Sequence, residues 1–154
     1  MYKRQRLDGG YGNDEIISNG GASQHDYEDD YLRGGPGHDA LMGAEGNDAL
    51  WGGTGNDTIW GGDGDDLIFM DRNNEGDQDI VYGQEGNDTF VFNGGQGSWI
   101  IDYEPGEIID TCGNEASAQT IQLGPHVAIF WFGETGWSDY MFIANTNIDD
   151  PYLT

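Results

Sequence analysis

Large apolar residues recur at every ninth position between residues 34 and 69, and glycines and polar residues fill the intervals. The segments GGPGHDALM, GAEGNDALW, GGTGNDTIW and GGDGDDLIF are consecutive copies of one nine-residue unit, G-G-x-G-x-D-x-U-x, in which U is large and apolar. Positions 7 to 9 of the unit predict a short strand, along which side chains alternate between two faces. Only position 8 can therefore face a core, which predicts as inward residues Ile16, Leu32, Leu41, Leu50, Ile59, Ile68, Val81 and Phe90.

The first six positions of the unit predict a tight turn, because glycines at positions 1, 2 and 4 reach positive φ angles at little cost. A turn and a strand make half a coil, so two units complete one turn of a flattened helix and residue i lies over residue i+18. Neighbouring coils would stack about 4.8 Å apart. The predicted fold is all-β: a right-handed parallel β-roll, or β-solenoid, with a C-terminal β cap.

The repeat continues on both sides of this block with interruptions. GGYGNDEII at residues 9–17 is intact, and seven residues then break the period before HDYEDDYLR at 25–33. Four residues are inserted before NEGDQDIVY at 74–82, and GQEGNDTFV restores the unit at 83–91. We expect the roll to cover residues 9–93.

Residues 1–8 are expected to be a truncated start. The first five, MYKRQ, resemble a translated sequencing-adaptor end, while Leu7 already holds position 8 of a repeat whose first half is missing. On this interpretation the chain is a fragment of a larger protein. The alternative is a genuine basic N-terminus.

Residues 94–154 are expected to form the C-terminal β cap, with a secretion-signal region as a further expectation. Trp99 stands where the next aspartate should be, so the ion-binding part of the roll should end near this point. The apolar runs TIQLGPHVAIFWF and WSDYMFIAN flank a hairpin signal at 133–136. These strands would cover the open end of the roll, because an uncapped solenoid exposes unpaired edge backbone.

Position 6 adds a carboxylate to a turn whose carbonyl oxygens are exposed, and these are the ligands that calcium prefers. Coil stacking would bring together four aspartate pairs, each holding at least one ion: Asp39/Asp57, Asp48/Asp66, Asp57/Asp79 and Asp66/Asp88. The expected metal ligands, from side chains and glycine carbonyls, are Asp14, Asp30, Gly35, Gly37, Asp39, Gly46, Asp48, Gly53, Gly55, Asp57, Gly62, Gly64, Asp66, Asp77, Asp79, Gly86 and Asp88.

Two other features of the turns bear on metal binding. The insertion echoes the first nine positions of an EF-hand loop, but Tyr82 stands where a bidentate glutamate is needed, so it is either an extended turn or an additional calcium site. The echo comes from Asp71, Asn73, Glu75, Gly76, Asp77 and Asp79. His25 and His38 fall in turns without zinc-ligand spacing, and we expect solvated histidines.

The charge balance limits the classes of partner. With 5 basic and 29 acidic residues the formal net charge is −24, and a chain with this charge and 27 glycines should be disordered without its ions. Nucleic-acid binding is excluded by the scarcity of cations, and anionic membranes are disfavoured. The sequence has no apolar run of membrane-spanning length. The single cysteine, Cys112, excludes an internal disulfide.

The nonapeptide unit resembles the RTX (repeats-in-toxin) family of calcium-binding repeats over residues 7 to about 110. The segment IIDYEPGEIID at 100–110 is similar to the one that commonly closes RTX arrays, although the usual downstream lysine is absent. The resemblance implies Ca²⁺ as the cofactor and a secreted, extracellular protein. It also implies a chain that stays unfolded in the calcium-poor cytoplasm, passes the type I secretion machinery and folds outside.

The sequence leaves two other function classes to weigh. An adhesion or glycan-binding or partner-binding module is kept open by outward aromatic ladders at position 9, formed by Met42, Trp51, Trp60, Phe69 and Tyr82, although ladder packing along the sheets would explain them too. Ice binding is disfavoured because only Thr58 and Thr89 occupy position 7. We expect no catalysis in this chain, since it carries no nucleophile elbow, zinc motif or phosphate-binding loop, while a catalytic domain upstream in the parent protein stays open.

Overall fold

The computed structural model describes residues 4–18, 28–70, 77–92, 96–111, 118–123, 126–132 and 138–143. Within these ranges all regular secondary structure is β-strand, so no described helix could cross a membrane. The strands are β1 (Arg6–Asp8), β2 (Glu15–Ile17), β3 (Tyr31–Pro36), β4 (Ala40–Glu45), β5 (Ala49–Thr54), β6 (Thr58–Asp63), β7 (Leu67–Met70), β8 (Ile80–Glu85), β9 (Thr89–Phe92), β10 (Gln96–Ile100), β11 (Ile108–Asp110), β12 (Ala118–Leu123), β13 (His126–Phe132) and β14 (Ser138–Ile143).

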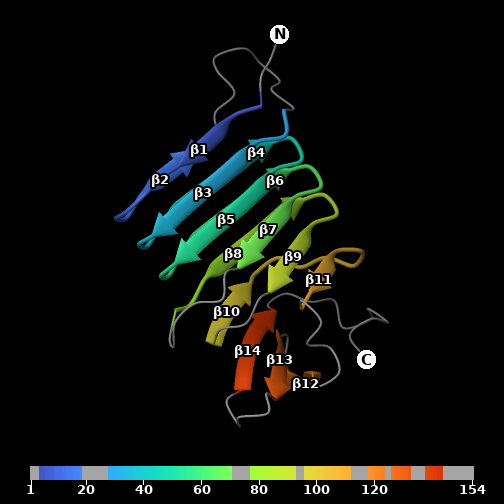
Figure 1. The fold of residues 1–154 in the computed structure, drawn as a ribbon. Coiled ribbons are helices and arrows are strands. Elements are labelled where there is room, and N and C mark those ends of the chain that lie inside the picture. Colours follow the sequence, from blue (N-terminus) through green and yellow to red (C-terminus); the bar gives the residue numbers. More distant parts are fainter. Residues whose placement is uncertain are drawn as a thin grey trace.

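Consecutive strands alternate between two sheets that lie against each other. Within each sheet the strands are stacked side by side along the roll (Figure 1). The odd sheet has the order β1-β3-β5-β7-β9-β11, and the even sheet runs β2-β4-β6-β8-β10 before it continues into β14, β13 and β12. Every pairing among β1 to β11 is parallel. This is the parallel β-roll that the repeat predicts.

The register follows the predicted coil length. In the central block Leu50 pairs with Ile68, and the hydrogen bonds of this block join residues 18 apart. Across the seven-residue interruption the spacing rises to 25, and across the four-residue insertion it rises to 22. Both additions fall between described parallel strands, and position 8 still stacks on position 8, as in the pair Ile59 and Val81.

Several strands are longer than the short strand that the sequence predicts. Five of them have six residues, because the first three positions of the following turn continue the pairing. Gly35 pairs with Gly53, and Gly62 pairs with Gln84. The nonapeptide pattern predicted a turn alone at these positions, because glycines reach positive φ angles at little cost.

The core confirms position 8 as the inward position. Seven of the eight predicted residues are fully buried, and Ile16 in an outermost strand is 8% exposed. The core also contains residues that the repeat pattern missed, among them Met70 and Phe92. Both follow a position-8 residue by two places, so side-chain alternation turns them inward too.

The C-terminal strands form the predicted hairpin and extend the even sheet. β13 is antiparallel to β14 and to β12, and β14 pairs in parallel with β10. Met141 and Ile143 of β14 are fully buried and join the core, and the Phe142 ring stacks on Trp99 at 4.4 Å between centroids. The cap therefore covers the free edge of β10. The parallel stack itself runs past residue 93 through β10 and β11.

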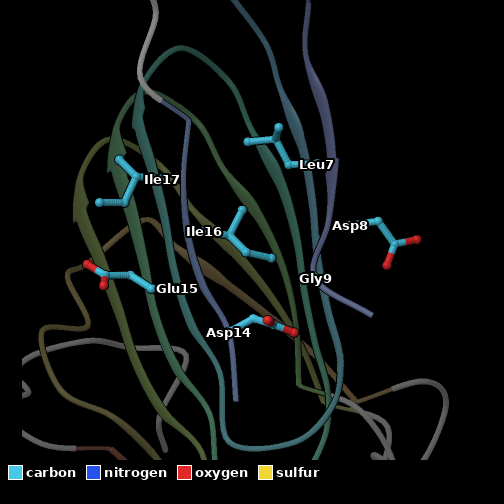
Figure 2. A pocket seen from close by; sticks show the side chains of 7 residues that line it. All are labelled: Leu7, Asp8, Gly9, Asp14, Glu15, Ile16 and Ile17. Carbon is cyan, nitrogen blue, oxygen red and sulfur yellow. The ribbon is translucent and has the colours of Figure 1, made fainter. Parts of the chain in front are cut away.

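At its N-terminal end the roll is open among the described residues. No described strand pairs with the outer edges of β1 and β2. Figure 2 shows Leu7 and Ile16 pointing toward each other across this mouth, while Asp8 and Ile17 point away. The pocket between them is lined by both strands and by the start of the turn that joins them. Leu7 thus holds position 8, as predicted, and stacks on Leu32.

Candidate metal sites

The aspartates at position 6 form two columns, one along each edge of the roll. The turns of the first edge lead from the odd sheet to the even sheet, and those of the second edge lead back. The first edge carries Asp14, Asp39, Asp57, Asp79 and Ser98. The second edge carries Asp30, Asp48, Asp66, Asp88 and Glu107.

One carboxylate oxygen of each of these aspartates except Asp14 accepts a hydrogen bond from the coil before it. The backbone N–H of Asp39 donates to Oδ1 of Asp57 at 2.8 Å, and the N–H of Asp57 donates to Oδ1 of Asp79 at 3.0 Å. On the second edge the N–H groups of Asp48 and Asp66 donate to the next aspartate at 2.8 and 2.9 Å. The structure thus brings together all four of the aspartate pairs that stacking predicts.

The second carboxylate oxygen of most of these aspartates has no hydrogen-bond donor, although it is buried. These oxygens are Oδ2 of Asp14, Asp39, Asp48, Asp57, Asp66 and Asp88. A Cβ added to Gly61, at position 1, would meet Oδ2 of Asp66 and the carbonyl oxygen of Gly83 in the next coil, and Gly34 and Gly43 show the same arrangement. A carboxylate oxygen that has no hydrogen-bond donor therefore lies close to a backbone carbonyl oxygen of the next coil at each of these turns.

The glycines at positions 2 and 4 let the coils approach this closely. A Cβ on Gly55, which has φ of 118°, would overlap the carbonyl oxygen of Gly37 in the coil before it. The predicted glycines all have positive φ and stack in this way: Gly35, Gly37, Gly46, Gly53, Gly55, Gly62, Gly64 and Gly86. Two turns of the second edge hold this conformation without glycine at position 2, at Ala44 (φ 77°) and Gln84 (φ 73°). Such a residue carries a steric cost.

The donor set decides which metal fits. Within the described ranges no three His, Cys, Asp or Glu side chains gather into one metal-binding group, so each site must combine carboxylates with backbone oxygens. Zinc prefers nitrogen and sulfur ligands, whereas calcium takes carboxylate and carbonyl oxygens in flexible geometry. The buried, donor-free oxygens fit calcium.

A comparison with protein-family models agrees with this donor set. The model of the RTX calcium-binding nonapeptide repeat matches four times, at residues 5–23, 26–50, 42–74 and 75–98, which together cover more than half of the chain. The chain belongs to the RTX repeat family. No curated protein matches it. The resemblance read from the nonapeptide is thereby confirmed, and the RTX turns are calcium-binding repeats.

Burial makes the ionised form of the RTX aspartates unfavourable in the absence of a cation. Desolvation raises the pKa of Asp48 to about 7, of Asp57 to about 6 and of Asp66 to about 8. The pKa of Asp39 is raised for the same reason. In each case desolvation is the largest effect. The backbone N–H from the preceding coil lowers the pKa in part, and the charges of neighbouring aspartates raise it. A bound cation would supply the charge that these carboxylates lack.

A second column of polar side chains was missed by the sequence analysis. At position 5 the side chain accepts a hydrogen bond from the backbone N–H of the next coil, which is the opposite direction to position 6. The N–H of Asp65 donates to Oδ1 of Asn47 at 3.0 Å, and the N–H of Asn56 donates to Nδ1 of His38 at 2.8 Å. The signal was present, because every unit from residue 9 to 91 has Asn, Asp, His or Gln at this position. His38 is exposed, as expected, and its ring also accepts a hydrogen bond as a member of this column.

Two predictions at the insertion and beyond it need separate mention. Oδ2 of Asp77 accepts a hydrogen bond from the N–H of Gly55 at 3.1 Å, while residues 71–76 of the insertion, like His25, lie outside the described residues. Trp99 was placed wrongly at position 6. Ser98 holds that position, since its Oγ accepts from the N–H of Asp79 at 3.2 Å and Trp99 pairs with Ile80. The spacing here is 19 residues, so aligning the glycines shifted the prediction by one place.

Proposed function

We propose that this chain is a calcium-dependent folding module of a secreted RTX protein, in which calcium binding between coils converts an expanded chain into the β-roll. One observation carries the proposal: in the two columns of position-6 aspartates, six buried Oδ2 atoms have no hydrogen-bond donor, those of Asp14, Asp39, Asp48, Asp57, Asp66 and Asp88. A buried charge without a partner is costly, and in these turns a calcium ion is the partner that the donor chemistry favours.

Electrostatics supports coupling between calcium binding and folding. Two unit negative charges about 4 Å apart repel by about 1 kcal/mol even in water, and by more where water is excluded. The formal net charge of −24 adds repulsion over the whole compact state. Because the sites form only when the coils stack, the binding free energy of the ions becomes folding free energy.

The same coupling supports a role in secretion. Weak calcium sites fill at the millimolar concentrations found outside cells, where extracellular calcium modules work. A chain of this charge would remain expanded in a calcium-poor compartment and would suit passage through a secretion channel. We therefore propose that the roll folds after export by the type I secretion machinery.

The alternative, an adhesion or glycan-binding module, depends on the aromatic ladders. The rings of Trp51 and Phe69 stack at 4.3 Å with an interplanar angle of 9°, and Trp60 stacks on Tyr82 at 5.8 Å and 8°. A sugar-binding strip would need ring faces turned to solvent, whereas these faces lie against each other along the sheets. Their half-buried state fits ladder packing. Calcium-dependent folding is therefore the function that we favour.

The proposal is tested by the hydrodynamic radius of the chain in chelator and in millimolar calcium. We expect a compact particle with calcium and an expanded one without it. Asp66→Asn with Asp88→Asn should weaken the response, whereas Asp63→Asn with Glu85→Gln removes the same formal charge from exposed positions of the same two turns and should spare it. A radius that does not depend on calcium in the unmodified chain would reject the function.

A further inference from the structure

The second edge ends in a turn that does not follow the nonapeptide template. Residues 102–107, DYEPGE, link β10 to β11, and Glu107 lies where the earlier turns carry aspartate. The register fixes this equivalence, because Ile108 pairs with Thr89 and its N–H donates to the carbonyl of Asp88 at 2.8 Å. Glu107 is 7% exposed, so its carboxylate lies inside the edge.

The carboxylates of Asp88 and Glu107 face each other without a donor between them. They lie within hydrogen-bonding reach of each other, yet Oδ2 of Asp88 and Oε1 of Glu107 have no hydrogen-bond donor. The other oxygen of Glu107, Oε2, accepts from the N–H of Glu104 at 2.7 Å. Each of these two neighbouring carboxylates therefore keeps one buried oxygen without a donor.

Among the described residues no cationic side chain lies near this pair to neutralise it. The described arginines, Arg4, Arg6 and Arg33, all belong to the first coils at the far end of the roll. Asp102 increases the negative charge nearby, since burial and then the charges of Asp88 and Asp102 raise the pKa of Glu107 to about 8. A small cation is the missing counter-charge that suits two buried carboxylates.

The turn is also held in place by the core. The Tyr103 hydroxyl donates to the carbonyl of Glu107 at 3.1 Å, and its ring packs on Phe90 at 6.5 Å between centroids. Asp102 accepts from the N–H groups of Gly83 and Gln84 at 2.9 and 3.2 Å, which ties this turn to the one before it. The two carboxylates are thus positioned by contacts that do not depend on a metal.

We propose that Asp88 and Glu107 are the charged ligands of a further calcium ion, which closes the second edge of the roll. The site rests on the proposed calcium binding by the repeats but uses a residue outside the nonapeptide template. Among the described residues the first edge shows no counterpart, because its last described position-6 side chain is the neutral hydroxyl of Ser98.

The number of calcium ions bound at saturation, measured by equilibrium dialysis and calorimetry, tests this site. Glu107→Gln should bind one ion fewer than the unmodified chain, and Asp88→Asn, which would serve two sites, should bind two fewer. Glu85→Gln, an exposed change in the adjacent turn, should bind the full number.

If Glu107→Gln does not fold in saturating calcium, Glu107→Asp keeps the charge on a side chain one methylene shorter. It should then fold and show a weakened last binding step. Full stoichiometry with an unchanged binding midpoint in these Glu107 variants would overturn the site, and would indicate that the two carboxyls share a proton instead. That result would leave calcium binding by the repeats intact, whereas an unmodified chain that binds no calcium would overturn both proposals.

Discussion

The two edges of the roll follow the same template, yet they differ in how strongly they depend on a counter-ion. On the second edge burial raises the pKa of Asp66 to about 8 and that of Asp48 to about 7, whereas on the first edge it raises the pKa of Asp57 to about 6. The second edge also contains Ala44 and Gln84 with left-handed backbone angles. Its last described position-6 residue is Glu107, whereas that of the first edge is Ser98.

This difference shows that turns with the same sequence motif can differ in how much they destabilise the calcium-free roll. On the second edge the pKa values of Asp48 and Asp66 are raised further than that of Asp57 on the first edge, and two turns accept a steric cost. Both features disfavour the calcium-free roll. Calcium should therefore contribute more to stability on the second edge than on the first.

The largest expected effect is the loss of calcium binding on both edges at once, because the two edges share one core. Leu50 is fully buried between the sheets, and Leu50→Asp would place an unpaired carboxylate there at a cost of several kcal/mol. We expect loss of the calcium-loaded circular dichroism signal and of calcium binding on both edges. Thr54→Asp, at an exposed position of the same strand, is the matched control. A folded Leu50→Asp variant would show that the core does not couple the edges.

The next prediction concerns pH in the absence of calcium. The carboxyls of Asp48, Asp57 and Asp66 have folded-state pKa values above their ordinary value of 3.8, so the calcium-free roll binds more protons than the unfolded chain. Its stability is fully present at pH values below this ordinary value and is lost as pH rises through about 6 to 8. Calcium-free protein should therefore be more compact at pH 5 than at pH 8, as measured by light scattering. Compaction that increases with pH would contradict the burial of these carboxyls.

Neutralising one aspartate on each edge, in separate variants, should show whether the two edges respond differently to pH. Without calcium, Asp66→Asn should shift the compaction midpoint to higher pH by more than Asp57→Asn does, because Asp66 has the higher pKa. With calcium, each variant should lose about two ions, since each aspartate stacks on two others. Equal midpoint shifts would mean that the edges are electrostatically equivalent.

The smallest expected effect concerns position 5, where the edges should behave alike. Asn47→Ala on the second edge and Asn56→Ala on the first each remove one side-chain acceptor for the next coil. Each should lower the free energy of unfolding with calcium by about 1 kcal/mol. Chemical denaturation measures the loss, with Thr54→Ala as an exposed control. Unequal losses would indicate that the difference between the edges extends to position 5.

The regular part of the roll could be predicted because one physical constraint repeats. Among the three strand positions of the unit only position 8 joins the core, so the apolar period predicted most core residues of the roll together with the coil length. The register across both interruptions was also predicted correctly, since Ile16 stacks on Leu41 and Ile59 stacks on Val81. The aspartate pairs followed from the same register.

The irregular end could not be predicted in the same way. Ser98 and Glu107 hold position 6 through strand register, while the glycines of the sequence suggested another alignment. Pairing of β14 with β10 joins segments far apart in the chain, and the alternating apolar pattern that predicts strands does not state their neighbours. Met70 and Phe92 entered the core because an apolar side chain replaced glycine at position 1.

The described cap strands pair with the even sheet, and this attachment limits how an array of this kind can change length. Consecutive nonapeptides alternate between the sheets, so one added or deleted unit of nine residues would move every later strand to the opposite sheet. β10 would then leave the even sheet and part from β14, and the two edges would exchange their turns beyond that point. Duplication of a whole coil of 18 residues preserves the sheet, the edge and the partner of each strand. The sequence thus repeats in nines, but gene duplication can extend the folded array only in eighteens.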